Sequence, residues 1–149
     1  MKAILVKLPM DKDRILSLLD CLGQYHQELT DHLPKSEKAY LSSIEKRRFC
    51  ERTLQLLIEI CIDISQLLLK ELKLGLPSGE ESVFDQLKEE KVISHEMNLK
   101  LKEMRRFRNV LVHHYAKVDD SLVYSNALHH REDFLQFKKE IIVFIKKIK

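Results

Sequence analysis

Hydrophobic residues recur at helical spacing along most of the chain. The clearest case lies between residues 42 and 74, where one apolar stripe includes Leu57 and Leu68 and a second includes Ile60 and Ile64. A helix that is apolar on two sides either lies at the centre of a bundle or shares one face with another subunit. We therefore expect this long helix to organise the fold.

Capping and breaking residues delimit the predicted helices. Asp11 is a candidate N-cap for a first helix that should end by Leu33, because Pro34 restricts the residue before it. Ser42 and Glu45 form a capping-box pattern that predicts the start of the long helix. Further helices are expected at about 80–91 after the loop Gly75–Gly79, from the cap Ser94 onward, and in a short and a final amphipathic segment after Asp119 and Asp120. The pattern predicts an all-α fold, an up-and-down bundle of four or five helices.

Composition agrees with this pattern. Leucine outnumbers valine by 25 to 8, and the chain of 149 residues contains 3 Gly and 3 Pro, which favours helices over strands. The length suits a single domain over residues 1–149. We find neither an apolar run of about 18 residues nor a secretion signal, so we expect a cytoplasmic protein without a membrane span. Its three cysteines fall within predicted helices, which indicates buried, reduced thiols.

Positive charge is concentrated in two segments. Residues 97–118 hold six Lys and Arg against one acid, and residues 138–149 hold five Lys against one acid. Each run is explained most simply as the solvated face of a helix. Only the first run has other functional side chains beside it.

Those side chains lie between Arg108 and Tyr115, which bring a guanidinium, an amide, two imidazoles and a phenol within eight residues. An arginine offers a fork of donors that suits phosphate, and a histidine exchanges protons near neutral pH. RNA transesterification needs both functions, because the 2′-hydroxyl must lose a proton while charge develops on the phosphate. No metal is then required. The alternative is that these are surface residues at the end of a helix, with Tyr115 in the core.

The spacing of Arg108 and His113 sets a geometric condition. Five positions rotate by about 140° on a straight helix, so the two side chains would not point at one atom. Either the helix distorts after Val112, or a second copy of the chain completes the site.

The segment Arg108–Tyr115 resembles the RxxxxHxY signature of the HEPN superfamily, in the form carried by HepT-like toxins. The resemblance extends to Glu51-Arg52 and the following helix with Ile62-Asp63-Ile64, and to residues 84–92. It covers about residues 11–149. His-x-Tyr in the signature selects His113, which leaves His114 as the variable position.

This resemblance implies a metal-independent ribonuclease toxin without a cofactor, a homodimer whose two motifs face one cleft. Arg108 would bind the scissile phosphate, His113 would transfer protons, and Asn109 would orient the site. The substrate would be tRNA or another structured RNA. The implied partner is an MNT-type nucleotidyltransferase antitoxin that transfers AMP to Tyr115, which would fill the cleft and repel phosphate.

Several alternatives remain open at this stage. Asp63 either orients the motif or belongs to a solvated polar line with its neighbours on the helix, and we prefer the second. The chain could instead be a non-catalytic helical partner subunit of a nucleotidyltransferase. A third possibility is a general nucleic-acid binder that uses Arg105, Arg106 and Arg108, which predicts a steep salt dependence without chemistry.

Overall fold

The structure is a computed structural model that describes residues 2–75, 78–113 and 118–148, with side chains from residue 12 onward. Over these ranges the chain forms seven α-helices and no strand, which confirms the predicted all-α class and exceeds the predicted number of four or five helices. No described helix is long and apolar enough to cross a membrane. The helices are α1 (Lys2–His32), α2 (Glu37–Leu41), α3 (Ile44–Glu71), α4 (Glu80–Glu89), α5 (His95–His113), α6 (Asp120–His130) and α7 (Glu132–Lys147).

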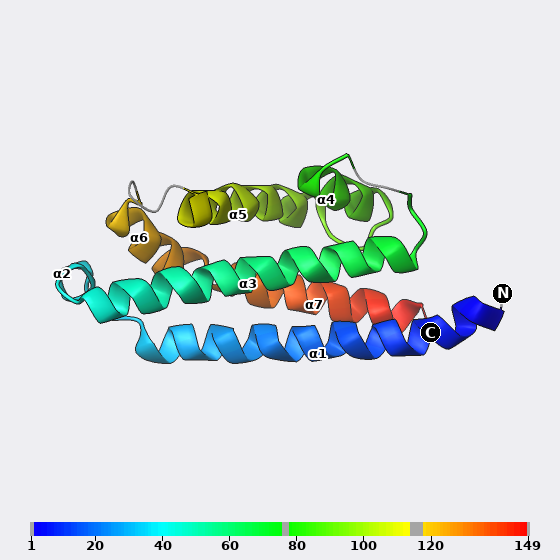
Figure 1. Ribbon diagram of the computed structural model, residues 1–149, viewed down its shortest axis with the longest axis horizontal. Coiled ribbons are helices and arrows are strands. Elements are labelled where there is room, and N and C mark those ends of the chain that lie inside the picture. Colours follow the sequence, from blue (N-terminus) through cyan, green and yellow to red (C-terminus); the bar gives the residue numbers. More distant parts are fainter. Residues whose placement is uncertain (1, 76–77, 114–117, 149) are drawn as a thin grey trace.

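Helix α3 lies at the centre of the bundle, with α1 on one side and α4 and α5 on the other (Figure 1). Both of its apolar stripes are buried: Leu57 and Leu68 in the first and Ile60 and Ile64 in the second are at most 8% exposed. A central position within one chain therefore explains the two-sided pattern. Helices α2 and α6 lie at one end of the bundle, and α4 lies at the other end with the start of α1 and the end of α7.

Two predicted helix starts are wrong. Helix α1 begins at Lys2 rather than near Asp11: most residues before Asp11 are good helix formers, and the helix continues through Pro9, the one helix-breaking residue among them. The N-cap of α3 is Ser43, whose Oγ accepts a hydrogen bond from the backbone N–H of Lys46 at 3.2 Å. Ser42 ends the preceding helix instead. The predicted start is thus one residue early, and Lys46 rather than Glu45 stands three residues after the cap, so the predicted capping-box pattern is wrong.

The additional helix is α2, a five-residue helix in the connection between α1 and α3. Ser36 caps it by accepting a hydrogen bond from the backbone N–H of Ala39 at 3.1 Å. Its one buried residue is Tyr40, which stacks at 5.2 Å on Tyr124 of α6. A helix this short carries no periodic signal in the sequence, and the contact of two distant aromatic rings holds it in place.

The remaining helix starts agree with the predictions. Ser94 caps α5 by accepting from the backbone N–H of Met97 at 3.0 Å, and Asp119 caps α6 in the same way. Helix α4 is anchored between α3 and α5 by three buried residues, Val83, Phe84 and Leu87. The buried residues of α5, by contrast, lie in its first half. Its second half, which carries the motif, is therefore only partly covered.

Candidate functional site

The three arginines of α5 form ion pairs with the first two residues of α4. Arg108 Nη2 donates to both carboxylate oxygens of Glu80, at 2.7 and 3.0 Å. Arg105 bridges the two acids, with Nε 2.9 Å from Glu80 and Nη1 3.1 Å from Glu81. Arg106 donates to Glu81 twice at 3.2 Å. Three positive charges thus meet two negative charges at close range.

The sequence analysis missed Glu80 and Glu81, which stand 24 to 28 residues from their arginine partners. The available signal was an acidic pair in the first turn of a short helix, where carboxylates interact favourably with the helix dipole. Nothing in the linear pattern shows that this turn lies against α5. The predicted free basic patch at Arg105 and Arg106 is consequently ion-paired in the structure.

Arg108 also lines a shallow pocket of about 200 Å³ between α3, α4 and α5. The other polar residues around this pocket are Glu59, Asp63, Gln66 and Glu80. The Arg108 side chain is 17% exposed, and its Nε is buried without a hydrogen-bond partner among the described residues. A ligand that enters the pocket therefore meets one guanidinium and three carboxylates.

Asp63 lines this pocket from α3; the residue as a whole is exposed, but its carboxylate is partly desolvated. Burial raises the pKa of Asp63, and the negative charge of Glu59 raises it further, whereas Arg14 and Arg108 act in the opposite direction. The structure therefore places Asp63 within electrostatic range of Arg108. The carboxylate bound to Arg108 is Glu80, however, so an orienting role of Asp63 remains a prediction.

His113 is the last residue of α5 and is exposed, and the half-buried Asn109 lies one turn before it. Neither residue lines the pocket of Arg108. Helix α5 runs unbroken to His113, so within the described residues no distortion brings the imidazole toward the guanidinium. His114 and Tyr115 lie outside the described residues. Completion of the site by a second chain, like a distortion beyond His113, therefore remains a prediction.

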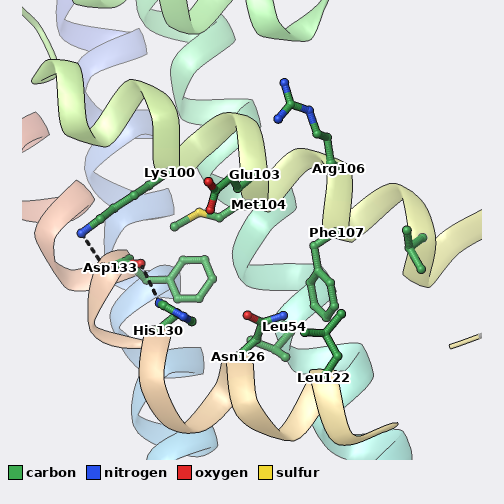
Figure 2. Close-up of a pocket in the computed structure, with 12 residues that line it drawn as sticks. Leu54, Lys100, Glu103, Met104, Arg106, Phe107, Leu122, Asn126, His130 and Asp133 are labelled. Atoms are coloured by element: carbon green, nitrogen blue, oxygen red, sulfur yellow. Dashed lines mark hydrogen bonds and ion pairs between the residues drawn. The ribbon is translucent and has the colours of Figure 1, made fainter. Parts of the chain in front are cut away.

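A second depression, the α5–α6 groove, lies beside the motif and has a volume of about 360 Å³. Phe107 of α5 and Leu122 of α6 approach each other over Leu54 of α3, and Arg106 points away from the groove (Figure 2). At its other end Lys100 donates to Asp133 at 2.9 Å. The groove is lined as well by Val110, and the side chains of Val110 and Leu122 are 38% and 49% exposed. An apolar surface therefore stays uncovered next to the motif.

Comparison with known proteins identifies the family of this chain. The family model described as Ribonuclease HepT-like matches residues 22–141. The chain is 33% identical over 110 residues to the tRNA nuclease HepT of Aphanizomenon flos-aquae, covering 71% of this chain and 72% of that protein. It is 34% identical over 84 residues to the mRNA nuclease HepT of Shewanella oneidensis, covering 56% of this chain and 63% of that protein.

Solved structures share the fold. A tri-AMPylated HEPN toxin of Shewanella oneidensis, in complex with an MNT antitoxin, aligns with a TM-score of 0.79 at 24% identity, over 87% of this chain and 96% of that one. The cytosolic protein of unknown function YutE from Bacillus subtilis aligns with a TM-score of 0.77 at 22% identity, over 92% of both chains. The match over residues 22–141, the identity to the tRNA nuclease HepT of Aphanizomenon flos-aquae and the fold together place this chain in the ribonuclease HepT-like family.

Proposed function

We propose that the chain is an endoribonuclease toxin that cleaves RNA by attack of a 2′-hydroxyl on the adjacent phosphate. The observation that carries the proposal is the Arg108–His113 pair at the end of α5 in a chain of the ribonuclease HepT-like family. The named nuclease relatives act on tRNA and on mRNA, which supports RNA as the substrate. Because the nucleophile belongs to the RNA itself, the reaction needs no metal-activated water.

In this mechanism His113 accepts the proton of the 2′-hydroxyl while the 2′-oxygen of the RNA attacks the adjacent phosphorus. The bond from phosphorus to the 5′-oxygen breaks, and that oxygen takes up the proton that the protonated His113 returns. The products are a 2′,3′-cyclic phosphate and a 5′-hydroxyl. Arg108 stabilises the charge on the phosphate with the donors that Glu80 leaves available, since the described ion pair occupies only Nη2.

The proposal includes a homodimer in which two copies of the motif face one cleft. Its support is the exposed His113 on a continuous helix, together with the exposed apolar residues Val110 and Leu122 of the α5–α6 groove. A second copy packed there would cover the groove and bring its own motif near Arg108. The expected result of light scattering is a dimer, and a Leu122→Glu variant should shift it toward the monomer.

We further propose that an MNT-type nucleotidyltransferase antitoxin neutralises the toxin by transferring AMP to Tyr115. The support is a solved structure of an AMPylated HEPN toxin in complex with an MNT antitoxin, which shares this fold. A bulky anion near Arg108 would compete with the substrate phosphate for the same guanidinium. Such a toxin would act on tRNA or another structured RNA in the cytoplasm.

The rival proposal is a non-catalytic partner subunit of the nucleotidyltransferase. The observation that favours it is the engagement of Arg108 by Glu80 in a pocket that His113 does not line. In that case the motif serves as an acceptor or nucleotide site, and the chain binds the transferase without cleaving RNA.

Cleavage of total tRNA in EDTA by the unmodified protein separates the two proposals. We expect cyclic-phosphate ends from the wild type and none from His113→Ala or Arg108→Ala. His129→Ala serves as the matched control, because this exposed histidine of α6 lies outside the motif. An inactive wild type of unmodified intact mass that still binds the transferase would support the partner subunit, and an active His113→Ala would exclude the proposed mechanism.

A further inference from the structure

A second basic surface lies far from the motif, between the α4–α5 connection and the C-terminal half of α7. We call it the lysine groove. Its volume is about 560 Å³, and its floor is apolar, with Val92 and Phe144 from the two sides. Its basic residues are Lys88, Lys91, Lys139 and Lys147, together with His95.

The residues that line the lysine groove carry a net positive charge. Its one acid is Glu140, whose carboxylate accepts hydrogen bonds from the backbone N–H and the hydroxyl of Ser94 at 2.7 and 3.1 Å. Glu140 therefore caps α5 rather than pairing with a groove lysine. The described ion pair of Lys88 is with the exposed Glu89 at 3.4 Å. The arginines of the motif, by contrast, are opposed by two carboxylates at hydrogen-bond distance.

Lys91 has an unfavourable backbone conformation in this groove. It follows α4 with a φ of +60°, and the turn is closed by hydrogen bonds from Lys91 N to Lys88 O and from Val92 N to Leu87 O. This is the helix-ending turn that ordinarily places glycine at the left-handed position. Lys73 has the same conformation after α3, with φ +55°, and does not line the groove. The two lysines form a matched pair for experiment.

We propose that the lysine groove binds the sugar–phosphate backbone of the RNA substrate, at a distance from the cleavage motif. This inference rests on the proposed ribonuclease function. Four lysines in one groove suit a polyanion, and the partly exposed ring of Phe144 offers a base a stacking surface. Because the ion-paired arginines add little free positive charge, most of the electrostatic attraction for RNA comes from this groove.

The length of α5 sets how long the RNA must be. His95 borders the lysine groove and His113 ends the helix, so the two ends lie about 27 Å apart at 1.5 Å per residue. A stacked strand at about 3.4 Å per nucleotide needs about eight nucleotides to span that distance. Long RNA can therefore contact both surfaces at once, whereas a tetranucleotide cannot.

The binding test uses tRNA and the inactive His113→Ala protein, with the four groove lysines replaced by alanine. Each lost phosphate contact changes the slope of log Kd against log salt by about 0.7–0.9, so we expect the slope to fall by about 3 and binding at 0.15 M salt to weaken at least ~10-fold. The control replaces four exposed lysines outside the groove, Lys35, Lys38, Lys70 and Lys73. Equal slopes and affinities of the groove and control variants would overturn the proposal.

A second test uses cleavage by protein with His113 intact. Replacement of the groove lysines should reduce the preference in kcat/KM for a long RNA over a tetranucleotide. An equal loss on both substrates would place the defect in the fold or the motif and would overturn the proposal. If the wild type cleaves neither substrate, the proposed function fails, and the binding test still decides on the groove.

The single substitution Lys91→Gly adds a sharper comparison. Lys91→Gly and Lys73→Gly both relieve a positive φ, so both should raise the unfolding temperature. Only Lys91→Gly should weaken tRNA binding. Unchanged tRNA binding by Lys91→Gly would overturn the RNA proposal. Loss only of binding to an acidic protein partner would also overturn it and would assign the groove to a protein.

Discussion

The ion pairs between α4 and α5 make the substitution Glu80→Ala a direct test of the site geometry. The carboxylate of Glu80 accepts three hydrogen bonds from Arg105 and Arg108. Its side chain is 29% exposed, and those of the two arginines are 27% and 17% exposed. Exposed ion pairs contribute about 0–1 kcal/mol, and well-buried charged hydrogen bonds about 1.5–3 kcal/mol. For these intermediate exposures we take about 1 kcal/mol for each pair, or about 2 kcal/mol in total.

A loss of this size should be visible in thermal unfolding. For a chain of this length, 1 kcal/mol corresponds to about 2–4 °C, so Glu80→Ala should lower Tm by about 4–8 °C. Differential scanning calorimetry at low salt measures the shift. In 1 M NaCl the Debye length falls to about 3 Å, and the difference from the wild type should shrink.

Glu81→Ala is the matched control. Glu81 also lies in the first turn of α4, so both variants lose the same favourable interaction with the helix dipole. One of its partners, Arg106, is 61% exposed, and that pair should contribute little. We expect Glu81→Ala to cost about half as much as Glu80→Ala. An unchanged Tm for Glu80→Ala, or a larger loss for Glu81→Ala, would refute the assignment of Glu80 as the main link between the helices.

Three further predictions concern pH, packing and thiols. Because the pKa of Asp63 is raised, the folded state favours the neutral carboxyl. The stabilising contribution of Asp63 is therefore present below the ordinary aspartate pKa and is lost as the pH rises through the folded-state pKa. Asp63→Asn should raise the urea midpoint of unfolding at pH 7 and not at pH 3. Phe137→Ala empties a fully buried position on α7 and should cost about 3–5 kcal/mol in urea unfolding. Burial raises the pKa of Cys50 to about 11 and that of Cys61 further, so a thiol reagent at pH 8 should modify the half-buried Cys21 first and the other two only on unfolding.

Helical periodicity was sufficient to predict most of the fold. The long apolar segments, the cap Ser94 and the break at Asp119 and Asp120 are local signals, and the structure confirms them; Asp119 also caps α6. The errors occur where the local signal is weak or ambiguous. Ser42 and Ser43 are both good caps, and the choice between them depends on how α2 ends. Helix α2 itself depends on the contact of Tyr40 with α6, which no local pattern encodes.

The candidate site was predictable only in part, because side-chain chemistry can be recognised in a sequence whereas electrostatic surroundings cannot. The motif Arg108–Tyr115 is contiguous, so its residues could be named without a structure. Its charge could not be evaluated, since the acids that oppose it come from α4. A count along the chain gives an excess of five positive charges between residues 97 and 118, and the structure places Glu80 and Glu81 against three of the arginines in that segment.

The opposite holds for the lysines near the C-terminus. In the sequence they form an ordinary amphipathic pattern, with lysines opposite Phe137 and Ile141, and a solvated helix face is a sufficient explanation. In the fold, Lys139 and Lys147 line the same groove as Lys88 and Lys91. The one acid of that groove, Glu140, accepts hydrogen bonds from Ser94 at the start of α5. Attraction for a polyanion depends on the net charge within about one Debye length, roughly 8 Å at physiological salt, and not on proximity in sequence. On our proposals, the surface that attracts RNA and the residues that cleave it therefore lie at opposite ends of the same helix.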